Sequence, residues 1–133
     1  MGRVFFNTRE NVHATDVAYT VLESDSGKTF LVSGGAQAIT LLPAADLIEG
    51  WNCRFVTTAS PSGDKTIGAG SAIMSGSAQD AGGGQGGGSD GTPKTSVVIK
   101  AAGQAGNWLE IMCDGSAYYY NGSASQDGAF TSS

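Results

Sequence analysis

The chain has 133 residues, of which 40% are hydrophobic and 14% are charged, and its formal net charge is −5. A chain of this length forms one domain with its own hydrophobic core. Its seven basic residues stand singly along the sequence. Nucleic acids and anionic membranes are bound by clustered Lys and Arg, so we expect the protein to bind neither.

We expect residues 1–16 to form an N-terminal arm or an edge strand ahead of a single domain at residues 17–133. The arm contains an apolar run, Val4, Phe5 and Phe6. Either this run packs on the chain's own core, as apolar residues tend to do, or it reaches outside its own domain. Both alternatives stay open at the level of sequence.

The first ten residues lack the apolar stretch of a signal peptide, and no apolar run approaches the 18 residues of a membrane span. We therefore expect synthesis in a reducing cytosol, with the thiols of Cys53 and Cys113 free. Free cysteines usually behave as small buried apolar residues. A bridge between the two stays open, because sequence does not fix the distance between their Cα atoms.

Two strands are predicted at residues 17–22 and 28–33, which are rich in β-branched and aromatic side chains. The turn sequence Ser-Asp-Ser-Gly lies between them, so we expect them to form a hairpin. A third strand at residues 38–42 is stopped by Pro43.

The only helical stretch is expected at residues 44–49, as one or two turns. Residues 51–58 then alternate, with Trp51, Cys53 and Phe55 on one side of the strand. A period of two indicates one buried face and one solvent-facing face.

Short strands are expected at residues 66–68 and 72–74. The composition then changes, and we expect a flexible surface loop at residues 75–93. Its glycine-rich centre, residues 80–89, has almost no side chains with which to pack a core. Because loop length costs little free energy, deletion of residues 82–88 is expected to leave folding intact.

Strands are also predicted at residues 95–100, 107–113 and 117–121, before a polar tail that is docked or frayed. The dipeptide Asp114-Gly115 between the last two strands predicts a hairpin. In the following tyrosine triplet, alternation sends the middle residue, Tyr119, to the face opposite its neighbours. Tyr119 is therefore a candidate interface residue, since tyrosine is enriched at interfaces.

Nine or ten short strands with regular turn residues are typical of a sandwich or a barrel. We predict an all-β protein with a single-domain β-sandwich. We favour a jelly-roll-like arrangement with one short helix and a glycine-rich surface loop.

No set of residues points to catalysis, and we expect a non-enzymatic protein without metal or cofactor. His13 is the only histidine and lies in a polar stretch without a nucleophile motif. Glu110 is interpreted as a solvated strand residue, because carboxylates are rarely buried without a partner. The glycines at 82, 84 and 87 match a dinucleotide motif only by composition, since a strand rather than a helix follows them.

Several segments occur in an order that resembles a known family. They are Asp-Ser-Gly-Lys-Thr-Phe, Ile-Thr-Leu-Leu-Pro-Ala-Ala, Arg-Phe-Val, Val-Val-Ile-Lys-Ala, Gly-Asn-Trp-Leu-Glu-Ile and Cys-Asp-Gly-Ser-Ala-Tyr-Tyr-Tyr-Asn-Gly. The chain resembles small virion proteins of tailed bacteriophages over residues 19–122, especially head decoration (cement) proteins. The glycine-rich loop and the extended amino terminus depart from this family.

The resemblance implies a structural protein on the exterior of the phage capsid, made in the host cytoplasm. Its partners would be the major capsid protein and itself, as a homotrimer. We take Val4, Phe5, Phe6 and Tyr119 as candidate contacts with the capsid or with other subunits. Related modules occur in phage tail fibres, so the alternative is an appendage that binds host glycans through exposed aromatic residues such as Trp108.

Overall fold

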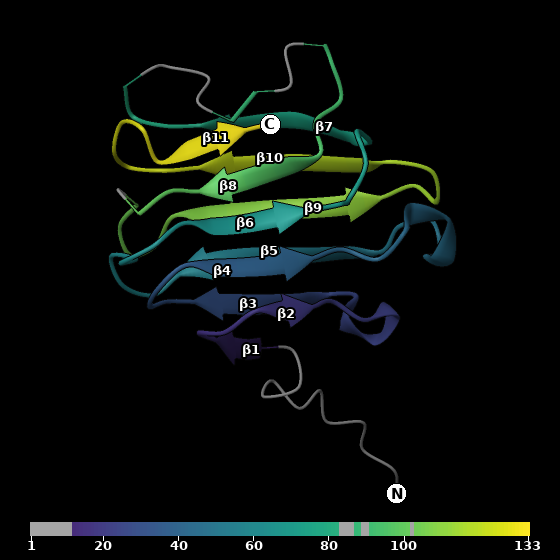
Figure 1. Ribbon diagram of the computed structural model, residues 1–133, viewed down its shortest axis with the longest axis horizontal. Coiled ribbons are helices and arrows are strands. Elements are labelled where there is room, and N and C mark those ends of the chain that lie inside the picture. Colours follow the sequence, from purple (N-terminus) through teal and green to yellow (C-terminus); the bar gives the residue numbers. More distant parts are fainter. Residues whose placement is uncertain (1–11, 83–86, 89–90, 102) are drawn as a thin grey trace, which may run out of the picture.

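The computed structural model describes residues 12–82, 87–88, 91–101 and 103–133, with side chains from residue 16 onward. It consists of two β-sheets packed face to face (Figure 1). The elements in chain order are β1 (Val12–Thr15), β2 (Tyr19–Thr20), the 3₁₀ turn η1 (Glu23–Asp25), β3 (Lys28–Val32), β4 (Gln37–Thr40), the 3₁₀ turn η2 (Ala44–Asp46), β5 (Asn52–Thr57), β6 (Lys65–Gly68), β7 (Met74–Gln79), β8 (Ser96–Ile99), β9 (Trp108–Cys113), β10 (Tyr118–Ser123) and β11 (Phe130–Ser132).

The strand order is β1-β3-β5-β9-β10-β7 in one sheet and β11-β8-β6-β4-β2 in the other. From β1 to β6, successive strands alternate between the two sheets, so that neighbours within a sheet run parallel. The next neighbours, β9 beside β5 and β8 beside β6, are antiparallel. The fold is thus an all-β sandwich. The jelly-roll arrangement is not confirmed: five of the nine strand pairs in the described residues are parallel, whereas jelly rolls are antiparallel.

The hairpin predicted from residues 17–22 and 28–33 is wrong, because its two strands lie in different sheets. After β2 the chain stays beside β4, with the N–H of Val21 donating to the carbonyl of Thr40 at 2.9 Å. It then crosses the core edge through η1 and enters the other sheet as β3. Strand alternation reports which face is buried, and it carries no information on which sheet a strand joins.

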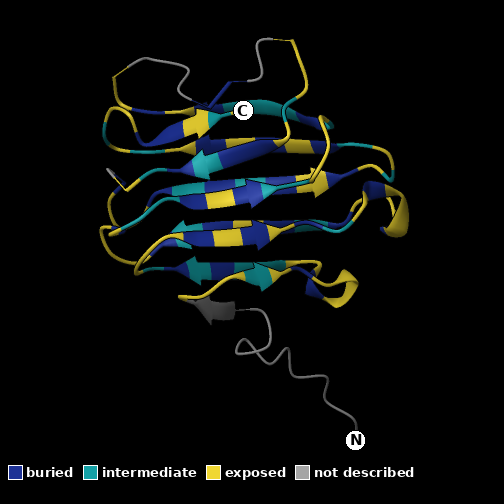
Figure 2. Ribbon diagram, viewed as in Figure 1, coloured by how far each residue is buried: buried dark blue, intermediate teal, exposed yellow. Residues whose placement is uncertain are grey.

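The core lies between the sheets and takes the alternate residues of nearly every strand (Figure 2). The rings of Phe30 and Phe55 stack at 5.1 Å, and Trp51 meets Tyr118 edge-on at 6.4 Å. Full burial of one such side chain stabilises the fold by about 1.5–3 kcal/mol. The predicted inward face of Trp51, Cys53 and Phe55 is confirmed.

Both cysteines are buried as free thiols. Burial raises the pKa of Cys53 and of Cys113 above the ordinary thiol value. The predicted helix at residues 44–49 is reduced to the single turn η2. In the part of the chain that the structure describes, no helix has the length and apolar character needed to cross a membrane.

The flexible loop expected at residues 75–93 and the strand expected at 72–74 both need correction. Residues 75–79 belong to β7, which begins at Met74 and pairs in parallel with β10. The small side chains of this strand gave a weak alternation signal. Residues 83–86 and 89–90 lie outside the described residues, so the expected flexibility there stays a prediction.

Described residues that follow β7 in the chain contact its outer edge at Met74 and at Ala78. Lys94 and Met74 exchange two backbone hydrogen bonds of 3.0 and 2.7 Å, and the Gly87 N–H lies 3.4 Å from the Ala78 carbonyl. A Cβ atom on Gly87 would lie 2.9 Å from the Cβ of Ala78 and 3.1 Å from that of Phe130. Only glycine therefore fits this close approach without a shift of its neighbours.

The β9–β10 hairpin is confirmed. The Oδ1 atom of Asp114 accepts the backbone N–H groups of Ser116 and Ala117, both at 2.8 Å, and Gly115 has the positive φ of 87° that the turn requires. The polar tail is docked through β11, which pairs with β8. The predicted arm segment, including Val4, Phe5 and Phe6, lies outside the described residues.

Candidate binding surface

The outward side of the six-stranded sheet is the candidate binding surface, and we call it the outer face. On strands β5, β9 and β10 every second side chain points away from the core. The ladder registers place these residues in three rows across the sheet: Asn52, Met112 and Tyr119; Arg54, Glu110 and Asn121; Val56, Trp108 and Ser123.

The first row carries two large side chains that the core does not cover. Met112 is 48% exposed and Tyr119 is 47% exposed, and they are direct partners across β9 and β10. The Tyr119 hydroxyl donates to the Oδ2 atom of Asp114 at 3.0 Å, and this hydrogen bond raises the pKa of Tyr119. A hollow of about 220 Å³ lies beside them, lined by Glu110, Met112, Tyr119, Tyr120 and Asn121.

The other two rows combine an ion pair with an aromatic ring. The Arg54 guanidinium lies 5.2 Å from the centre of the Trp108 ring, and its Nη2 atom lies 2.9 Å from the Oε2 atom of Glu110. Both charged side chains are more than one-third exposed, so their attraction contributes at most about 1 kcal/mol. A second hollow, of about 240 Å³, has Trp108 in its lining.

Of the predicted contact residues, Tyr119 is where alternation places it, between the buried rings of Tyr118 and Tyr120. Glu110 is on the outer face as expected, but it is paired with Arg54. Met112 was missed, although it alternates with the buried residues of β9 and could have been found by the same pattern. His13 lies in β1, whose side chains are outside the description.

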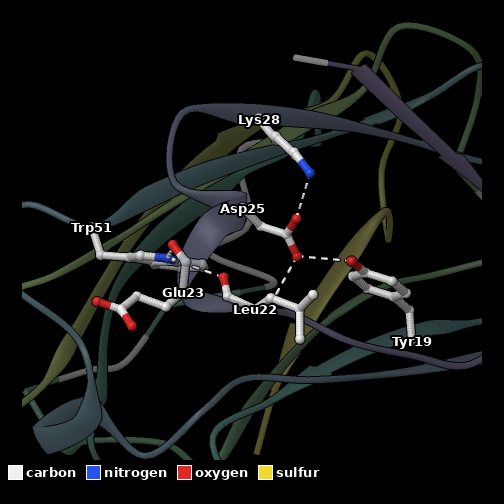
Figure 3. Close-up of polar contacts among 6 residues, drawn as sticks. All are labelled: Tyr19, Leu22, Glu23, Asp25, Lys28 and Trp51. Carbon is white, nitrogen blue, oxygen red and sulfur yellow. Dashed lines mark hydrogen bonds and ion pairs between the residues drawn. The ribbon is translucent and has the colours of Figure 1, made fainter. Parts of the chain in front are cut away.

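A buried carboxylate organises the turn that precedes β3 (Figure 3). Asp25 is fully buried and accepts hydrogen bonds from the Tyr19 hydroxyl at 2.8 Å, the Leu22 N–H at 2.8 Å and the Lys28 ammonium at 2.7 Å. Burial acts to raise the pKa of Asp25, but these three donors outweigh it and hold the pKa below its ordinary value. Burial and the contact with Asp25 raise the pKa of Tyr19 to about 12.

Lys65 is also fully buried, in β6. Its ammonium donates to the carbonyls of Gly34 (2.7 Å), Gly35 and Gly63 (3.1 Å). Three carbonyl acceptors match the three N–H bonds of an ammonium group. The Lys65 and Asp25 side chains therefore have their donors and acceptors occupied within the fold, and we interpret both as structural.

In the described ranges, no group of three or more His, Cys, Asp or Glu residues is placed to hold a metal ion. No protein-family model matches the chain, and neither a curated protein nor a solved structure does so. The resemblance to phage decoration proteins therefore stays a prediction from the sequence motifs.

Proposed function

We propose that the protein is a structural virion subunit that docks on the exterior of a tailed-phage capsid and stabilises the junctions between capsomers. Two lines of reasoning support this proposal. The first is the order of motifs shared with decoration proteins between residues 19 and 122. The second is the outer face, which offers a docking surface on a rigid sheet. In this role the protein has no catalytic activity and needs no cofactor.

On the outer face, the pair Met112 and Tyr119 is the observation that carries the docking role. Aromatic residues and methionine are enriched at protein interfaces, where their apolar bodies are removed from water. Tyr119 also keeps its hydroxyl bonded to Asp114, so its ring is oriented before a partner arrives. A preoriented side chain loses less conformational entropy on binding.

Self-association into a homotrimer is part of the proposal, with Val4, Phe5 and Phe6 as further contacts. A subunit that binds only the intact shell stabilises it by mass action, because its binding free energy is lost when the capsomers separate. The proposed partners are the major capsid protein and further copies of this chain. The proposed location is the capsid exterior, after synthesis in the host cytoplasm.

The decisive experiment is cryo-microscopy of the virion that carries this protein. We expect density for the sandwich on the capsid surface, with the outer face toward a partner. A purified Met112→Thr/Tyr119→Ser variant should remain folded and fail to co-sediment with capsids from which the protein has been removed. Absence of the density, or unchanged co-sedimentation of the variant, would contradict the proposal.

A glycan-binding appendage module is the second candidate. The specific observation in its favour is the ring of Trp108 beside Arg54, Glu110 and a hollow, since aromatic faces with neighbouring hydrogen-bonding groups suit sugar rings. A glycan array tests it directly. Binding that is lost in Trp108→Ala and in Tyr119→Ala, without unfolding, would favour this candidate over capsid docking.

A further inference from the structure

Two turns at one end of the sandwich expose aliphatic side chains among carboxylates. Leu22 is 51% exposed beside η1, and Ile48 is 66% exposed just after η2. Glu23, Asp46 and Glu49 are exposed next to them. We call these five residues the acidic rim. Figure 1 shows both turns at the same side of the sandwich, on the right.

The acidic rim is held in shape by buried side chains. The indole N–H of the buried Trp51 donates to the carbonyls of Leu22 (3.3 Å) and Glu23 (3.1 Å). The backbone N–H of Trp51 donates to the Ile48 carbonyl (3.1 Å). Asp25 fixes the first turn by accepting the Leu22 N–H (Figure 3). Both halves of the rim are thus attached to one tryptophan, and the surface is preorganised for a partner.

The charge of the rim favours a basic partner. Its three carboxylates have no basic residue among the five rim positions, and the nearest lysine along the chain, Lys28, is bonded to Asp25. A ligand that fits must therefore combine apolar side chains for Leu22 and Ile48 with positive charge for the surrounding acids.

The first 11 residues of the chain have this composition. They contain Arg3 and Arg9 around the apolar run Val4, Phe5 and Phe6, with Glu10 as the only acid. They precede Val12, which pairs with Thr29 at the start of β3 and so lies at the same end of the sandwich as the rim. Eleven residues can extend on the order of 35–40 Å, enough to reach an adjacent subunit.

We propose that residues 1–11 of one copy bind the acidic rim of a second copy. The inference rests on the self-association in the proposed function and names the surfaces that carry it. Each copy supplies one arm and one rim, so a contact from the arm of one copy to the rim of the next is heterologous, and it closes into a ring where the rotation between neighbours completes a full turn.

Analytical ultracentrifugation of the full chain tests the exchange. Glu23→Gln/Glu49→Gln and Phe5→Ser/Phe6→Ser should each weaken self-association at least tenfold, about 1.4 kcal/mol. The control Thr66→Lys/Thr131→Lys makes the same change of +2 in charge as the rim variant, at exposed positions of the five-stranded sheet. This control should associate as the wild type does. A rim variant that associates like the wild type, or a wild type that stays monomeric at every concentration, would overturn the inference.

Cross-linking separates exchange between copies from docking of an arm on its own rim. A photoreactive benzoylphenylalanine at Phe6, in a mixture of ¹⁵N-labelled and unlabelled copies, should give peptides that join a labelled arm to an unlabelled rim. Cross-links confined to single chains would refute exchange. Virion imaging tests capsid docking independently of the arm exchange. If imaging alone failed to show the protein on the capsid, the capsid role would be refuted, and these solution results would still support the arm exchange.

Discussion

Replacement of Asp25 by asparagine tests whether one buried carboxylate holds the first turn of the sandwich. The change keeps the side-chain shape and removes the charge from three hydrogen bonds of 2.7–2.8 Å. A hydrogen bond to a charged group contributes about 1.5–3 kcal/mol, against about 0.5–1.5 kcal/mol for a neutral one. With about 1 kcal/mol lost for each of three donors, Asp25→Asn should lower the free energy of unfolding by about 3 kcal/mol.

Urea unfolding followed by tryptophan fluorescence measures this loss, because the Trp51 indole is bonded to the same turn. Asp64→Asn is the matched control: it removes a carboxylate from Lys100, but that pair is more than one-third exposed and should cost less than about 1 kcal/mol. Equal losses in the two variants would refute the special role of the buried carboxylate.

The pH dependence gives a second test of Asp25. Its pKa is lower in the folded protein than in the unfolded chain, so the unfolded state binds more protons as the pH falls below about 4. The stabilisation is therefore present above the unfolded pKa and is lost as the pH falls through the folded pKa. In Asp25→Asn, the acid limb of the stability curve should be shallower than in the wild type.

Five further substitutions separate surface from core. Tyr119→Ser should change the free energy of unfolding by less than about 0.5 kcal/mol, whereas Tyr118→Ser should cost about 3–5 kcal/mol by emptying a core site; similar losses in urea unfolding would contradict the assigned faces. Gly87→Val should lower the free energy of unfolding by about 1–3 kcal/mol through overpacking. Gly35→Ala, where a Cβ meets nothing within 4 Å, should be nearly neutral, and equal melting temperatures of the two variants would contradict this difference. Lys65→Met should cost about 2–4 kcal/mol, because three carbonyls lose their donor, and an unchanged melting temperature would show that water replaces the ammonium.

The alternation of side chains was enough to predict the central strands and their buried faces. Trp51, Cys53 and Phe55 are inside, and Tyr119 is outside, because a pleated strand leaves each side chain only two directions. The dipeptide Asp114-Gly115 predicted its hairpin because its turn needs a positive φ and a side-chain acceptor. These features depend on neighbouring residues alone.

What the sequence did not predict depends on residues far apart in the chain. Arg54 and Glu110 are 56 positions apart and meet only because β5 pairs with β9. The order in which strands alternate between sheets is likewise a property of the whole fold. The glycine-rich segment was interpreted as flexible from its composition, yet Gly87 is buried because a residue without a side chain fits against Ala78 and Phe130. The deletion of residues 82–88 should therefore destabilise the fold by uncovering β7, contrary to the expectation from loop length.

The backbone contacts of Gly87 and Lys94 along β7 bear on solubility at high concentration. An unpaired strand edge acts as a template on which further chains add without limit. At β7 the chain itself already contacts that template at Met74 and Ala78, and in the described residues β1 ends the same sheet on its far side. Strand-by-strand growth of this sheet would need two open edges, so these contacts disfavour the addition of further copies at β7.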